Sequence, residues 1–419
     1  MTMTLSLQNT KKYAIALYII IFTITKSVII NRASLLVALG ICGMGYLSNS
    51  DFKYKGNFFL RAVILYGILL LISMLYTISP IDRAQKSYFS YLTMFMVVFF
   101  VVDSIKTEKD VKFFMNVFIV AAVMNCIVTY IRVGSEAFQL LGSSETNFRL
   151  ASEEQNANVV GMYCAYGAIF SFHFILREKL TKKKKLLYIG ALLLNFVFGL
   201  LTGSRKAMLL LFVGISILVY YKTILDRNAI KILFRMFFAL IAVIALIYFI
   251  LTSGYFSVIS ERLEGLLAGI LGNDEVDNST MRRMYMIKTG WKVFWTYPII
   301  GQGISASYRY FLTYSHSNFI EILMNTGAVG FFIFYKPFYT SLRKLFKQSR
   351  KDPLYPIVLF VILWFIVVGF GLVFYYSKFE MAILAVATSW LIIKENEKND
   401  ETDKKSIEKS QSGVVGSNK

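Results

Sequence analysis

Long apolar runs, separated by short polar or basic connections, extend along most of this chain. A bilayer's hydrocarbon core is about 30 Å thick, so a helix needs about 20 mostly apolar residues to cross it. Runs of this kind predict about twelve transmembrane helices. Their ranges are 13–30, 34–48, 58–78, 85–102, 111–131, 156–176, 186–202, 207–221, 233–252, 317–335, 355–376 and 379–393. We therefore expect an all-α, polytopic integral membrane protein.

The composition agrees with this prediction. The chain is 56% hydrophobic and only 17% charged, which is too apolar for a soluble domain. A net charge of +20 would indicate nucleic acid as the partner of a soluble protein, but here the basic residues cluster between apolar runs. We expect the lipid bilayer, and no nucleic acid, as a partner. The three cysteines lie inside apolar runs without metal-ligand spacing, so we interpret them as small core residues.

The basic clusters fall on alternate connections, which is typical of the positive-inside rule. The clusters are Lys53–Lys55, Lys106–Lys112, Lys182–Lys185, Lys222–Lys231 and Lys336–Lys351. An even number of spans then places both termini in the cytoplasm. We expect one transmembrane domain over 1–393 and a polar, disordered cytoplasmic tail over 394–419.

One connection on the opposite side is long, from about 253 to 316. Its segment DNSTMRRMYMIKTGWKVFWTYP has apolar residues at helical spacing, which predicts a helix lying at the outer membrane surface. Long structured loops of this kind usually carry function.

The stretch SHSNFIEILMNTGAVG contains His316, one of two histidines in the chain. It lies where the long loop meets the tenth predicted span. An imidazole has a pKa near neutrality, which suits a proton acceptor, and Glu321 follows close enough to share the site. The alternative is a histidine that is only solvated at headgroup level. His173, near the cytoplasmic end of the sixth span, is interpreted as an interfacial residue without a catalytic role.

A short basic turn, TGSRKAML, joins two predicted spans on the outer side. The positive-inside rule disfavours cations there, and a cation near hydrocarbon is costly, so Arg205 and Lys206 indicate an anionic partner. Ser204 and the backbone amides beside Gly203 can add donors to a phosphate. The alternative is a plain turn with snorkelling basic side chains.

Further candidates for substrate binding lie in the two long outer segments. Arg282 and Arg283 are adjacent, so at most one fully faces a ligand while the other meets lipid headgroups. Gly301 and Gly303 read as a tight turn that returns the chain to the membrane. Arg149, Asn156 and the neighbouring polar residues open the sixth span, and an ordinary polar helix start explains them equally well. The acidic run 273–278 reads as a solvated loop.

Together these motifs resemble a known family. A GSR turn between two spans, a long outer loop ending in P-x-x-G-x-G, then HSNFIE and the pair Gly327 and Gly330, are similar to the O-antigen ligase and O-antigen polymerase superfamily of bacterial membrane glycosyltransferases. The resemblance covers about residues 185–335. It depends on the order of the motifs, since none is specific alone.

The resemblance implies a GT-C-like fold and transfer of a glycan from undecaprenyl diphosphate to an acceptor hydroxyl at the outer face of the bacterial cytoplasmic membrane. The reaction would invert the anomeric centre and require no nucleotide sugar, metal or other cofactor. Arg205 would grip the carrier diphosphate, Arg282 or Arg283 would supply a second cation, and His316 would be the general base. The family's HN pairing is HSN here, which leaves Asn318 one place further along.

We therefore expect a polysaccharide polymerase whose partners are the lipid-linked donor, a glycan acceptor, a flippase and a chain-length regulator. A ligase that attaches glycan to lipid or protein is the nearest alternative. A flippase of lipid-linked glycan would instead need cations at mid-membrane depth, whereas these cations gather at the outer boundary.

Overall fold

The computed structural model describes residues 2–25, 27–47, 56–134, 156–225 and 278–415. All regular elements within these ranges are α-helices. They are α1 (Thr2–Ile24), α2 (Val28–Leu47), α3 (Phe58–Ser73), α4 (Ile81–Ser104), α5 (Glu108–Val133), α7 (Ala157–Arg177), α8 (Lys182–Leu201), α9 (Arg205–Leu225), α12 (Asn278–Thr296), α13 (Ser307–Phe311), α14 (Asn318–Phe346), α15 (Tyr355–Val368) and α16 (Lys378–Val415).

Six helices of the described chain are long and apolar enough to cross a membrane, namely α4, α5, α7, α8, α9 and α14. Helices α3 and α15 are apolar but shorter. The all-helical, polytopic architecture predicted from the apolar runs is thus confirmed. Each predicted span overlaps a helix except 233–252, which lies outside the described residues, and the span 13–30 extends over the break between α1 and α2. A total of about twelve spans stays a prediction.

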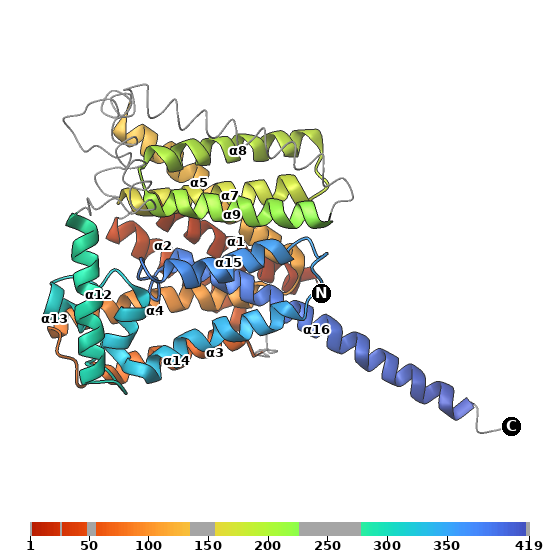
Figure 1. The fold of residues 1–419 in the computed structure, drawn as a ribbon. Helices are drawn as coiled ribbons and strands as arrows, with labels where there is room; N and C mark the ends of the chain where they lie inside the picture. Colours follow the sequence, from red (N-terminus) through yellow and green to blue (C-terminus); the bar gives the residue numbers. More distant parts are fainter. Residues whose placement is uncertain (1, 26, 48–55, 135–155, 226–277, 416–419) are drawn as a thin grey trace.

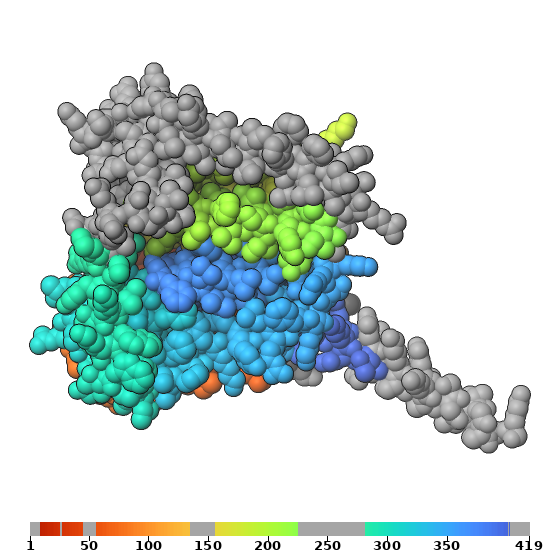
Figure 2. All heavy atoms as spheres, in the orientation of Figure 1, coloured from red at the N-terminus to blue at the C-terminus, as the bar shows by residue number. Residues whose placement is uncertain are grey.

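Most of these helices run side by side along one direction (Figure 1). Helix α7 packs against α5, α8 and α9, while α14 packs on α3 and α15. The green surface of α9 lies directly against the blue one of α15 in Figure 2. A small residue permits the closest approach, because a Cβ at Gly167 of α7 would lie 2.6 Å from the Cβ of Ala122 in α5. The three cysteines are buried and free, as predicted for core residues.

The two ends of the bundle differ. Helix α1 begins, and α16 projects outward, at the same end (Figure 1), which we call the termini end. Ion pairs join neighbouring helices there, among them Lys12–Asp110 (2.8 Å), Lys112–Glu178 (2.6 Å) and Lys394–Asp352 (3.0 Å). At the opposite end, which we call the His316 end, α12 runs across the ends of the bundle helices. The predicted helix of this segment is present at Asn278–Thr296, and its place at a membrane surface stays a prediction.

Two helices differ from the sequence-based expectation. Helix α16 continues through Val415, whereas a disordered tail was expected from 394 onward. The extra segment is rich in Glu and Lys, which are good helix formers even without an apolar face. Helix α14 is interrupted at Gly327, whose φ of 60° and ψ of −158° leave the helical region. A Cβ there would lie 2.4 Å from the carbonyl oxygen of Ile299, so only glycine fits.

Candidate functional site

His316 lies in the short loop between α13 and α14, at the end of the bundle named after it. Its φ is 60°, in the left-handed region that non-glycine residues rarely adopt. Such a conformation costs about 1–3 kcal/mol and persists only when the surroundings impose it. The neighbours of His316 do this. The hydroxyl of Ser315 donates to the carbonyl of Ser317 (2.9 Å), and the hydroxyl of Ser317 donates to the carbonyl of Gly369 (3.2 Å).

Glu321 also holds this loop in place. This buried carboxylate of α14 accepts hydrogen bonds from the backbone N–H of Ser315 (2.7 Å) and from the hydroxyl of Ser307 in α13 (2.7 Å). Both of its oxygens are therefore committed to the loop and to α13. Glu321, predicted to share the site with His316, acts on the histidine through the backbone of the residue before it.

Asn318 joins α14 to the segment between α15 and α16. Its side-chain oxygen accepts from the backbone N–H groups of Phe374 (3.0 Å) and Tyr375 (3.1 Å), and its amide nitrogen donates to the hydroxyl of Tyr335 (2.9 Å). The side chain is fully buried. These bonds give the asparagine a structural role, and the substrate-binding role expected from its place in the family motif stays a prediction.

This arrangement predicts a loss of stability on truncation. Asn318→Ala leaves two buried N–H groups without an acceptor, so we expect the free energy of unfolding to fall by about 2–5 kcal/mol. Thermal unfolding of the purified variant in detergent measures this. Asn156→Ala is the control, since it removes only an exposed cap of α7 and should cost about 1 kcal/mol. Equal stability of Asn318→Ala and wild type would contradict the structural role.

Three cations from two distant segments act on the imidazole of His316. Burial and then the charges of Arg283, Lys206 and Arg282, in that order of size, together lower its pKa from the usual 6.5 to about 4. The aromatic ring of Tyr314 lies 4.3 Å from the imidazole, centroid to centroid. No described residue donates or accepts a hydrogen bond at the imidazole. His316 is thus neutral at physiological pH and able to accept a proton.

Lys206 is fixed at this end by the segment after α15. Its ammonium donates a hydrogen bond to the carbonyl oxygen of Gly371. Arg205 begins α9 beside it and is half-buried. Ser204 precedes both and is fully buried, and its hydroxyl lies 3.4 Å from the N–H of Ala207, as in a helix cap. The cations of the basic turn therefore lie at the start of α9, while the hydroxyl of Ser204 caps the backbone of that helix.

The two arginines of α12 are not equivalent. Arg283 is half-buried and Arg282 is exposed, and the charge of Arg283 has the larger effect on the pKa of His316. Adjacent residues on a helix point in different directions, so one of them faces the site more directly. We take Arg283 as that residue, a choice that the sequence analysis left open between Arg282 and Arg283.

The predicted turn at Gly301 and Gly303 fastens the segment between α12 and α13 to the bundle. Both glycines have positive φ, at 66° and 88°. The N–H of Gly303 donates to the carbonyl of Asn325 (2.9 Å), and a Cβ at Gly301 would lie 2.7 Å from the backbone of Gly327. The turn thus packs into the break of α14 and serves the architecture rather than exposing a binding loop.

Two remaining candidates lie apart from this cluster. Asn156 caps the start of α7 by accepting from the N–H of Asn158 (2.9 Å), which agrees with the alternative of an ordinary helix start. Arg149 lies outside the described residues, as does most of the acidic run 273–278. His173 is fully buried in α7, with Phe174 at 5.8 Å between ring centroids, rather than interfacial as expected.

Sequence reasoning missed three contributors, namely Tyr314, Ser315 and Ser317. The only local signal is the spacing of the serines on either side of His316, which favours side-chain to backbone bonds. Nothing in the local pattern indicates the partner of Ser317, because Gly369 lies 52 residues away in sequence.

The pKa of His316 predicts a pH dependence for any reaction in which it acts as a base. Activity is lost as the pH falls through the pKa of the free enzyme, so the acid limb of kcat/KM should lie near pH 4. Arg283→Gln removes the largest of the charges that lower this pKa. The limb should then move upward, toward the usual value of about 6.5. Lys292→Gln, on the same helix and exposed, should leave it in place. An unchanged acid limb of kcat/KM in Arg283→Gln would show that the charge of Arg283 does not affect the pKa of His316.

The described features define an all-helical membrane protein with a histidine and several cations gathered at one end of its bundle. Residues 190–335 match the model of the O-antigen ligase family. The match includes the basic turn, Arg282, Arg283 and His316, and it confirms the resemblance to the O-antigen ligase and polymerase superfamily. A comparison with curated proteins finds no match.

Proposed function

We propose that this protein is a polysaccharide polymerase that transfers glycan repeat units from undecaprenyl diphosphate to a sugar hydroxyl. In this proposal the His316 end faces the outside of the bacterial cytoplasmic membrane and the termini face the cytoplasm. The observation that carries the proposal is the convergence of Lys206, Arg282 and Arg283 on a neutral His316. The family match over the same residues supports it.

The proposed step is a single displacement. His316 takes the proton of the acceptor hydroxyl while that oxygen forms a bond to C1 of the donor sugar. The bond from C1 to the diphosphate oxygen breaks, and the electron pair leaves with the lipid diphosphate. Because the nucleophile attacks opposite the leaving group, the configuration at C1 is inverted.

The cations stabilise the negative charge that develops on the leaving group. Guanidinium forks of Arg205 and Arg283 match phosphate oxygens in a bidentate manner, and Lys206 adds a point charge. Fixed donors placed where charge develops lower the barrier more than they stabilise the ground state. The same cations lower the pKa of His316, which keeps it unprotonated until the acceptor arrives.

A reaction with a defined donor tests the proposal. Purified protein is incubated with a synthetic undecaprenyl-diphosphate repeat unit in the presence of EDTA, and the products are separated on a gel. We expect a ladder of lengths. Unchanged donor with correctly folded protein would contradict a transferase and favour transport.

The description of the matched family favours one second candidate, a ligase. A ligase would consume finished polymer and attach it once to a lipid or protein acceptor. Adding preformed lipid-linked polymer with such an acceptor distinguishes the two, because the ligase gives one shifted product and no ladder.

A further inference from the structure

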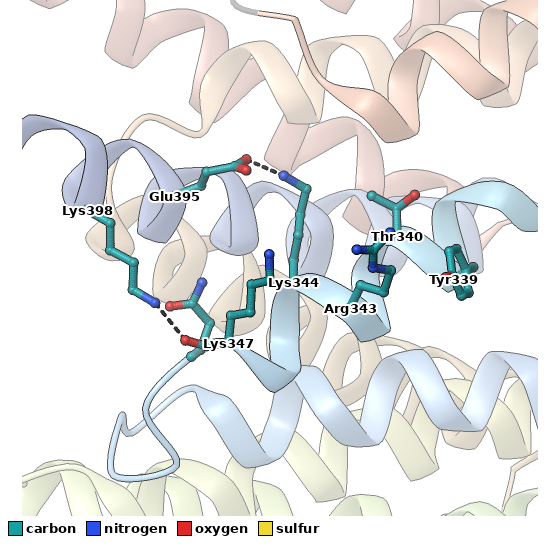
Figure 3. A pocket seen from close by; sticks show the side chains of 8 residues that line it. Tyr339, Thr340, Arg343, Lys344, Lys347, Glu395 and Lys398 are labelled. Atoms are coloured by element: carbon teal, nitrogen blue, oxygen red, sulfur yellow. Dashed lines mark hydrogen bonds and ion pairs between the residues drawn. The ribbon is translucent and has the colours of Figure 1, made fainter. Parts of the chain in front are cut away.

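A second group of cations lies at the termini end, away from His316. A pocket of about 290 Å³ opens there between the end of α14 and the outgoing part of α16 (Figure 3). Four basic side chains line it, namely Arg343, Lys344, Lys347 and Lys398. Glu395 is the one carboxylate among the described residues that line it. The pocket is therefore strongly positive, and none of its residues belongs to the proposed reaction.

Two of the four cations are already engaged. Lys344 forms an ion pair with Glu395, and Lys398 donates to the backbone carbonyl of Lys347 (2.6 Å). Figure 3 shows both contacts as dashed lines. The side chains of Arg343 and Lys347 have no carboxylate partner among the described residues, and both are exposed. Their charges are thus available to an anion in the pocket.

The pocket lies at the end of an apolar face of α14. Phe332, Tyr339 and Phe346 follow one another at intervals of seven residues, so they share one side of the helix. They are 71%, 63% and 70% exposed, which is the behaviour of side chains that contact lipid chains. Arg343 lies over the ring of Tyr339, at 5.8 Å from its centroid. Tyrosines of this kind mark the boundary between hydrocarbon and headgroups.

We propose that this pocket binds the phosphate headgroup of an anionic membrane lipid. The acyl chains would lie along the exposed face of α14 at Phe332 and Tyr339, and the phosphate would contact Arg343 and Lys347. Basic pockets between helices at this depth are suited to anionic headgroups. A soluble phosphate shares the headgroup chemistry, but it would make no use of the apolar face that leads into the pocket.

Lipid retention measured by native mass spectrometry tests the proposal. The full-length protein is equilibrated in nanodiscs of equal phosphatidylcholine and phosphatidylglycerol and then released. We expect wild type to retain phosphatidylglycerol selectively. Arg343→Gln with Lys347→Gln should reduce that selectivity roughly twenty-five-fold, since each basic group contributes about fivefold in affinity. Arg350→Gln, exposed at the same end but outside the pocket, should change nothing.

A second variant raises binding instead of lowering it. Glu395→Gln removes the one carboxylate and releases Lys344, so retention of phosphatidylglycerol should increase. This gain cannot come from misfolding. Equal retention by wild type and the double variant would overturn the proposal. Binding of inorganic phosphate to the pocket without selective retention of phosphatidylglycerol would overturn it too, because the ligand would then be a soluble anion.

Discussion

Replacing His316 with asparagine is expected to lower turnover about 10²–10⁴-fold, the usual contribution of a general base. Asparagine is the informative substitute because His316 has a φ of 60°, and asparagine tolerates that conformation better than alanine. The loop should therefore keep its shape while losing the proton acceptor. The measurement is the initial rate of donor consumption at saturating lipid-linked substrate, together with a check that the variant elutes as wild type does.

The matched control uses the same loop. Leu312 also has a positive φ, 58°, and is 76% exposed. Leu312→Asn thus places asparagine in the same backbone conformation without removing an imidazole, and its turnover should remain close to that of wild type. If His316→Asn retains more than a tenth of the wild-type rate, the histidine is not the base. Loss of turnover in both variants would point to the loop rather than to the imidazole.

The helices themselves follow from hydropathy. Apolar runs long enough to cross a bilayer are a strong local signal, and the apolar residues of α12 at helical spacing predicted that helix as well. His316 and Lys206 could also be selected as candidates from the sequence, because a histidine or a cation at the boundary of the hydrocarbon is unusual. These predictions needed only short windows of sequence.

The contacts that hold these residues in place could not be predicted from short windows of sequence. Asn318 was expected to bind substrate, but its structural role was not foreseen, because its partners Phe374 and Tyr375 lie 56 and 57 residues away in sequence. The pairing depends on how α14 meets the segment before α16, which no local pattern encodes. The continuation of α16 was missed for a different reason. By hydropathy this segment is a polar tail, but Glu and Lys have a high intrinsic helix propensity that does not depend on an apolar face.

The second large effect on turnover is expected for Arg205, the arginine of the basic turn. Arg205→Ala should lower turnover about 10²–10³-fold, the cost of removing one fixed donor from a developing oxyanion. Arg205→Lys should recover part of the rate, because an ammonium keeps the charge but cannot form a bidentate pair with phosphate. Rates and apparent KM for the lipid-linked donor, measured side by side, separate loss of chemistry from loss of binding.

The fold should tolerate this change. Arg205 is at the first position of α9, where a cation opposes the helix dipole, so alanine does not weaken the helix. Lys288→Ala is the control, since Lys288 is exposed on α12 within the same family region and its charge is not among those that lower the pKa of His316. It should react at the wild-type rate. Full turnover in Arg205→Ala would show that the leaving diphosphate is stabilised elsewhere, and the proposed set of cations would then have to exclude Arg205.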